Sequence, residues 1–140
     1  MKKLWLISLP VIVLLLLAAC TSGTTTSPTA ATSTTAGGTT AGQLSASGQA
    51  VFSSRCAGCH GASGQGGAGP TIIGSGQALA KYNTAQGLLA YISANMPASA
   101  PGSLSAQQYL EVTAYLLVQN NYVSSGQVLE VAGLVSISLR

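Results

Sequence analysis

Apolar and polar positions divide the chain into parts of different character. Leu4 to Ala19 is an almost unbroken apolar run, and Thr21 to about Gln43 consists mainly of Thr, Ser, Gly and Ala. From about Leu44 onward, apolar residues recur every three or four positions, which is the spacing of one face of an α-helix. No long run alternates with a period of two, as a half-buried strand would, so the sequence predicts an all-α fold.

Hydroxyl side chains precede the apolar repeats and provide helix caps. The predicted helices are one that runs toward Arg55 after Ser45 or Ser47, one over 85–93 after Thr84, and one that follows Ser105 and ends near 120–121. Ser105 and Gln108 also have the spacing of a capping box.

The first residues have the pattern of a secretory signal. Lys2 and Lys3 precede the apolar run, which is short for a bilayer span of about 20 residues. The run ends in small residues before Cys20, which resembles the bacterial lipobox, where cleavage leaves the Cys to carry a diacylglycerol. An ordinary signal peptide or an uncleaved anchor is the alternative. We expect residues 1–19 to be a lipoprotein signal peptide and Cys20 to anchor an exported protein to a bacterial membrane, facing the periplasm or the cell exterior.

The remaining chain is expected to be a tether, a domain and an extension. Residues 20–43 have too little apolar bulk to offset chain entropy, and we interpret them as a disordered tether. Residues 44–123 are the predicted domain, and residues 124–140 are a C-terminal extension whose structure the pattern does not predict. The domain is short, and aromatic residues make up only 5% of the chain. A core this small usually needs an additional stabilising element, and a buried cofactor would supply one.

Charge excludes some partners. The formal net charge is +3, but Lys2 and Lys3 lie in the signal. After its removal, the remaining charged side chains sum to only +1: Arg55, Lys81, Arg140, Glu111 and Glu130. This near neutrality indicates no nucleic-acid partner.

Cys56-Ala57-Gly58-Cys59-His60 is the strongest chemical signal in the chain. The spacing C-x-x-C-H is typical of c-type haem attachment, in which two thiols form thioethers with the haem vinyl groups and the adjacent His binds iron. Export strengthens this reading, because haem is attached outside the cytoplasm. The sequence thus predicts one covalent haem c.

Three other interpretations of the C-x-x-C-H motif have less support from the sequence. A zinc site lacks further ligands, because His60 is the only His and no second Cys pair exists. A thioredoxin-like redox pair needs a βαβ setting, and a disulfide between Cys56 and Cys59 is sterically poor. Assigning Cys20 to lipid and the other two cysteines to haem leaves no thiol over.

Met96 and Pro70 are the further candidates at the iron. Once Met1 leaves with the signal, Met96 is the only thioether, and it lies in a loop before Pro97. We expect His60 and Met96 to be the axial ligands, although Met in so apolar a chain is ordinarily core filler. The loop at Pro70 could supply a carbonyl that orients His60, unless Pro70 is only a turn residue.

The segment Gly64–Gly69 fits G-x-G-x-x-G, the phosphate-binding pattern of dinucleotide folds. No predicted strand precedes it, and no acidic residue lies about 20 positions later, so this interpretation fails. We expect these glycines to let the backbone pass close to a flat cofactor.

Residues 44–123 resemble a class I cytochrome c. The resemblance rests on three motifs in this order: C-x-x-C-H at 56–60, Gly69-Pro70 and Met96-Pro97. The resemblance implies covalent haem, His/Met coordination and a crossing of the first and last helices at Gly48, Phe52 and Tyr115. The Lys ring of family members that dock electrostatically is absent, since only Arg55 and Lys81 are available.

The resemblance implies an electron carrier rather than an enzyme. Its expected partners are membrane or periplasmic redox proteins, such as a dehydrogenase, an oxidase or a cytochrome complex. The alternative is a haem protein with an open iron site, either peroxidase-like or gas-sensing, for which a distal acid/base residue is not evident.

Overall fold

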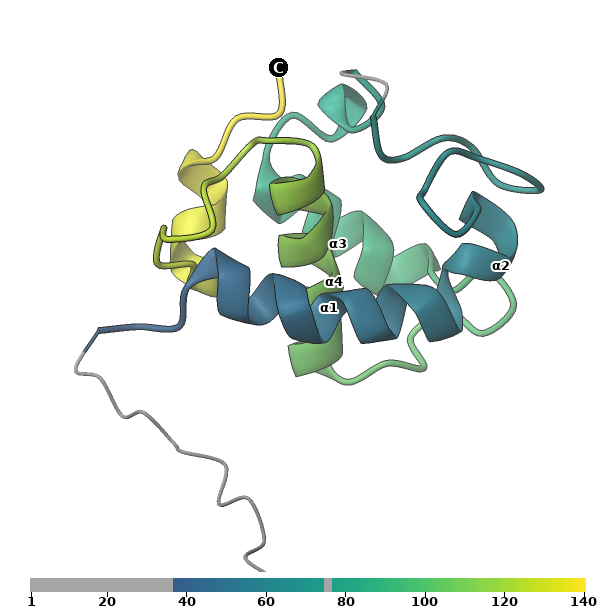
Figure 1. Ribbon diagram of the computed structural model, residues 1–140, viewed down its shortest axis with the longest axis horizontal. Helices are drawn as coiled ribbons and strands as arrows, with labels where there is room; N and C mark the ends of the chain where they lie inside the picture. The colour runs from purple at the N-terminus through teal and green to yellow at the C-terminus, as the bar shows by residue number, and fades with distance from the viewer. Residues whose placement is uncertain (1–36, 75–76) are drawn as a thin grey trace, which may run out of the picture. The chain divides into compact units, whose positions relative to one another are not determined.

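The computed structural model describes residues 37–74 and 77–140. The predicted signal peptide, Cys20 and most of the predicted tether therefore lie outside the described residues. The described part is helical, with isolated β-bridges but no strand, which confirms the all-α prediction (Figure 1). No helix within these residues has both the length and the hydropathy to cross a bilayer.

Helix α1 (Ala41–Arg55) begins earlier than the sequence predicted. The cap is Thr40, not Ser45 or Ser47, and its side chain accepts from the backbone N–H of Gln43 at 3.3 Å. The side chain of Gln43 accepts in turn from the backbone N–H of Thr40, which completes a capping box. Helix α1 thus starts at Ala41, inside the stretch that the sequence predicted to be the tether, because its capping residues lie among threonines with no apolar period.

Helix α1 crosses α4 (Ala106–Gln119) at a glycine, as the sequence predicted. A Cβ on Gly48 would overlap the backbone carbonyl of Glu111, so only glycine allows this approach. Phe52 follows one turn later and packs on Tyr115, with ring centroids 5.1 Å apart. Phe52 is fully buried, so this crossing forms the centre of the core.

The remaining helices match the predicted caps. Helix α3 (Ala85–Asn95) starts after Thr84, whose hydroxyl accepts from the N–H of Gly87. Helix α4 starts after Ser105 with the predicted capping box and ends close to the predicted position. Short helices α2 (Ala57–His60) and η1 (Ala80–Tyr82) lie between α1 and α3. Helix α3 ends two residues later than expected.

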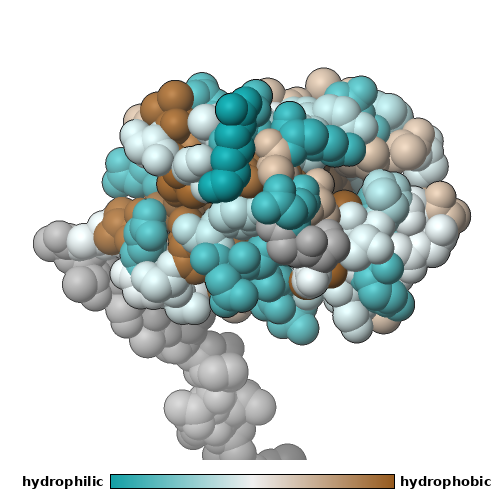
Figure 2. All heavy atoms as spheres, turned by 90° about the horizontal axis from the view of Figure 1, so that it is seen from above, coloured by the Kyte–Doolittle hydropathy of each residue, from teal (hydrophilic) through white to brown (hydrophobic). Residues whose placement is uncertain are grey.

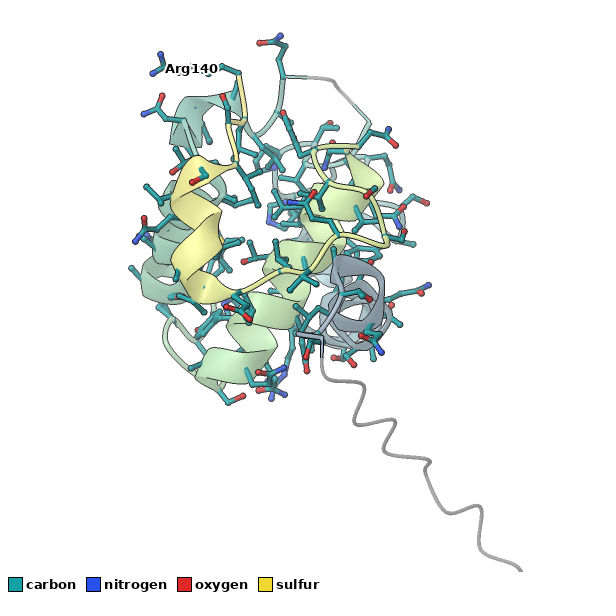
Figure 3. The ribbon with its side chains drawn as sticks, turned by 90° about the vertical axis from the view of Figure 1, so that its left-hand side faces the viewer. Arg140 is labelled. Carbon is teal, nitrogen blue, oxygen red and sulfur yellow. The ribbon has the colours of Figure 1, made fainter. Side chains whose placement is uncertain are left out.

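The C-terminal extension, which the sequence left undefined, packs on the domain. It contains the 3-10 helix η2 (Val131–Ser136) and buries Leu129, Leu134 and Leu139. Isolated bridges join it to the start of α1 at Thr40–Val128 and to the start of α3 at Thr84–Ser138. Figure 3 shows this segment lying across one face, with Arg140 at its end, where Nε donates to Oδ1 of Asn83 at 2.9 Å.

Candidate functional site

A cavity of about 350 Å³ lies beside α2, α3 and α4. Its apolar wall comes mainly from the core, including Phe52, Leu79, Leu88, Ile92 and Val112. The cavity is also lined by every site residue that the sequence proposed within the described residues: Cys56, Cys59, His60, Pro70 and Met96. Residues up to 40 positions apart in sequence therefore meet at one site.

Helices α1 and α2 place the two cysteines. Cys56 follows the last residue of α1, and its N–H donates to the carbonyl of Phe52, while Cys59 lies within α2. Both thiols are free, and Cys59 is exposed. Burial raises the pKa of the Cys56 thiol, and the neighbouring Cys59 raises it further, so Cys56 stays protonated at neutral pH. Both thiols are thus available at the cavity instead of being consumed in a disulfide.

His60 is buried at the end of α2 and is oriented by a backbone carbonyl. Its Nδ1 lies 2.8 Å from the carbonyl oxygen of Pro70. A carbonyl can only accept, so Nδ1 must donate, and the neutral ring then carries its lone pair on Nε2. The loop at Pro70 thus selects the tautomer that makes Nε2 available as a metal ligand.

The glycine-rich loop packs directly on the His60 ring. A Cβ at Gly69 would lie 2.9 Å from Cε1 of His60, and one at Gly64 would lie 2.7 Å from the side chain of Ile73. Gly64 has a φ of 73°, which side chains rarely adopt. The segment opens no helix, so the rejection of the dinucleotide pattern stands; here the glycines let the backbone approach His60 and Ile73.

Met96 is fixed by its backbone. It caps the C-terminus of α3, where its N–H donates to the carbonyl of Ile92 at 2.9 Å. Its own carbonyl accepts from the hydroxyl of Tyr109 at 2.8 Å. Tyr109 was not predicted as a site residue, although a buried tyrosine in an apolar helix face needs a partner for its hydroxyl, and that requirement was the available signal.

Cationic side chains also line the cavity, which the sequence did not predict. Arg55 and Lys81 are both in the lining, and no carboxylate from the described part of the chain accompanies them. Lys81 Nζ lies 5.1 Å from the ring centroid of Tyr82 and 5.9 Å from that of Tyr91, within cation–π range. Burial raises the pKa of Tyr82, and Lys81 opposes this shift, so the phenol stays neutral beside the cation.

The cavity fits a c-type haem. It offers an apolar wall, two free thiols, an imidazole with an available Nε2 and a thioether. The described residues hold no group of three or more His, Cys, Asp or Glu that could bind a metal ion. Arg55 and Lys81 bring positive charge to a site that takes a cofactor with carboxylate groups.

Comparison with known proteins agrees with this site. The model of the family "Cytochrome C oxidase, cbb3-type, subunit III" matches residues 43–116. A solved structure, "Crystal Structure of the Sulfane Dehydrogenase SoxCD from Paracoccus pantotrophus", matches with 24% sequence identity and a TM-score of 0.57. That match covers 73% of this chain but only 53% of the other, so this chain spans about half its length. No curated protein sequence matches the chain.

The family match spans the crossing of α1 with α4, the C-x-x-C-H motif, the loop at Pro70 and Met96. The structural likeness shows the fold alone. Together with the cavity, the family match establishes a covalently bound c-type haem and a haem-based electron carrier. The chain belongs to the cbb3-type subunit III cytochrome family and is a mono-haem class I cytochrome c.

Proposed function

We propose that the protein is an exported, lipid-anchored electron carrier whose haem iron is ligated by His60 and Met96. The bound haem supplies a one-electron ferric/ferrous couple. The observation that carries the proposal is the hydrogen bond from His60 Nδ1 to Pro70, on the same cavity that Met96 lines. It leaves Nε2 free for iron, and among residues 37–74 and 77–140 Met96 is the one thioether that lines the cavity.

The protein's own residues have limited tasks in electron transfer. Cys56 and Cys59 would hold the haem covalently, and Pro70 would keep the His60 ring from turning. Tyr109, through the Met96 carbonyl, would hold the thioether in place. The apolar wall would exclude water, which with Met ligation favours the ferrous state and raises the potential.

The variant Met96→Ala tests the ligation. We expect the sixth iron position to open, the near-infrared sulfur-to-iron band to disappear and the potential to fall, since a neutral thioether stabilises ferrous iron. Carbon monoxide should then bind rapidly to the reduced variant but not to the wild type. If the wild type already binds carbon monoxide rapidly, the open-site alternative, peroxidase-like or gas-sensing, replaces this proposal.

The anchor needs a separate test, because Cys20 lies outside the described residues. In the variant Cys20→Ser, we expect loss of lipid modification and unprocessed or mislocalised protein, because the acyl chains, which contribute about 0.8 kcal/mol for each buried CH₂, are no longer added. Mass spectrometry of the N-terminus and flotation with membranes measure both effects. Wild-type protein that a salt wash releases would contradict the anchor.

The proposed partners are membrane or periplasmic redox proteins: a dehydrogenase, an oxidase or a cytochrome complex. The family description names an oxidase subunit, and the similar structure is named a dehydrogenase, which supports this class of partner. Reduction of the purified protein by isolated membrane complexes, compared one by one, would identify the donor.

A further inference from the structure

The exposed apolar side chains of the domain are concentrated in one short segment. Within residues 37–74 and 77–140, the large exposed hydrophobic residues are Val128, Val131 and Val135, with 48%, 54% and 56% exposure, and Tyr91 with 38%. Tyr91 is accounted for by its contacts with Tyr82 and Lys81 at the cavity. The three valines lie within eight positions of one another in the C-terminal segment and have no comparable explanation.

The fold holds these valines facing outward. Leu129 and Leu134, on either side of Val131, are 3% and 0% exposed. The backbone N–H of Leu129 donates to the carbonyl of Thr39 at 3.0 Å, which fixes the segment. The valines therefore cannot turn inward without removing the leucines from the core. These three exposed side chains are here called the valine surface.

The valine surface lies where the chain enters the domain. The N–H of Ala41 donates to the carbonyl of Gln127 at 2.7 Å, and Thr40 bridges to Val128. The 36 residues that precede the described domain, including the proposed lipid-bearing Cys20, thus lead to this end. Figure 1 shows the C-terminal segment beside the start of α1, with α2 at the opposite end, and Figure 2 shows strongly hydrophobic residues at the same left-hand end.

The haem attachment motif lies at the other end of α1. Helix α1 has 15 residues, which at 1.5 Å per residue separates its ends by about 22 Å. We propose that the valine surface rests on a zwitterionic lipid bilayer, so that the anchored domain holds its haem end away from the membrane. This inference rests on the proposed lipid anchor. Glu130 is the only charged side chain in residues 124–139, which suits a zwitterionic surface better than an anionic one.

The lipid anchor allows the small valine surface to stay in contact with the bilayer. Three half-exposed valines would bind a bilayer weakly on their own, because hydrophobic transfer is proportional to the area removed from water. A tether raises the local concentration of the surface at the bilayer, so a weak contact becomes populated. The contact would set the orientation of the domain rather than its attachment.

The test uses the full-length, lipid-modified holoprotein in phosphatidylcholine vesicles. With haem and lipid on the native cysteines, Ala132→Cys provides a single thiol for a fluorophore beside the valine surface. Ala50→Cys, on an exposed position of α1, provides the control label. We expect nitroxides on the lipid acyl chains to quench the label at 132 several-fold more than the label at 50. Aqueous iodide should show the reverse preference.

A matched variant tests whether the valines cause the contact with lipid. Val131→Thr with Val135→Thr keeps the side-chain shape and removes the apolar character at exposed positions. We expect lipid quenching at 132 to fall to the level at 50, with flotation and the haem spectrum unchanged. Flotation without preferential quenching at 132 would overturn the valine surface and leave the anchor standing. Loss of flotation in the parent protein would overturn both. Protection of the label from both quenchers, relieved by dilution with unlabelled protein, would assign the surface to a second copy and overturn the lipid contact.

Discussion

Glycines allow close packing at both the α1–α4 crossing and the haem cavity, but the space beside them is filled by different groups. At the crossing, Gly48 allows helix backbones to meet, and Phe52 and Tyr115 fill the space beside it. At the cavity, Gly69 allows the loop to approach His60, but the space beyond is about 350 Å³ that no side chain fills. Side chains of the protein fill the space at the crossing, whereas the cofactor fills the cavity.

The same change of residue should therefore have different consequences in the two regions. At the crossing, lost packing should appear as lost stability. At the cavity, a displaced side chain should appear first in the spectrum and potential of the haem. Four variants test this contrast.

The variant Cys56→Ala with Cys59→Ala should have the largest effect, because it removes the covalent haem. Without the haem, the apolar lining of the cavity loses its packing partner, and the stability of a small domain is only about 5–15 kcal/mol. We expect the loss of cooperative thermal unfolding, measured by circular dichroism. Gly58→Ala is the control, because its Cβ would meet nothing within 4 Å and both thiols remain.

The variant Gly48→Ala should separate α1 from α4. Its Cβ would overlap the Glu111 carbonyl, and such overpacking costs typically about 1–3 kcal/mol. We expect the midpoint of chemical unfolding to fall in the holoprotein while the potential stays within error. Gly126→Ala, where a Cβ has open space, should leave the midpoint unchanged. Equal stability of the two variants would show that the crossing is not held by close backbone contact.

The variant Tyr109→Phe affects the link between the two regions. It removes the hydroxyl that donates to the Met96 carbonyl and accepts from the N–H of Leu104, at a cost of about 1 kcal/mol for each hydrogen bond. We expect a modest loss of stability together with faster binding of carbon monoxide to the reduced protein, because the proposed ligand is held less firmly. Tyr122→Phe is a matched control, since that hydroxyl bonds to Leu139 in the C-terminal segment. Identical carbon monoxide kinetics in both variants would contradict the role of Tyr109.

The variant Gly69→Ala should have the smallest effect on stability. Its Cβ would lie 2.9 Å from Cε1 of His60, so the ring must shift by a few tenths of an ångström. We expect the hydrogen bond to Pro70 to weaken and the potential to change, while the unfolding midpoint stays close to that of the parent. A redox titration beside a denaturant titration measures the two. A large fall in stability without any change in potential would show that Gly69, like Gly48, acts through packing alone.

The local sequence was sufficient for the chemistry and for most of the helices. The C-x-x-C-H spacing is local, and the caps at Thr84 and Ser105 lie directly before periodic apolar residues. The start of α1 was missed because its cap, Thr40, lies in a Thr-rich stretch with no apolar period to mark it.

The parts that escaped prediction depend on contacts between distant residues. The bond from Tyr109 to Met96 joins α4 to the end of α3, and Arg55 and Lys81 meet at the cavity only after folding. The C-terminal segment is held by separate contacts with the starts of α1 and α3, at Thr40 and Thr84. Neither periodicity nor spacing within that segment indicates these contacts.

The helix caps also bear on how the domain responds to acid. Helices α1, α3 and α4 all begin with a hydroxyl cap, from Thr40, Thr84 and Ser105, and none has an acidic residue in its first turn. An Asp cap loses its charge as the pH falls through its pKa, and its favourable interaction with the helix dipole weakens. A hydroxyl does not titrate in this range. The start of each of these helices should thus be equally stable in neutral and in acidified surroundings.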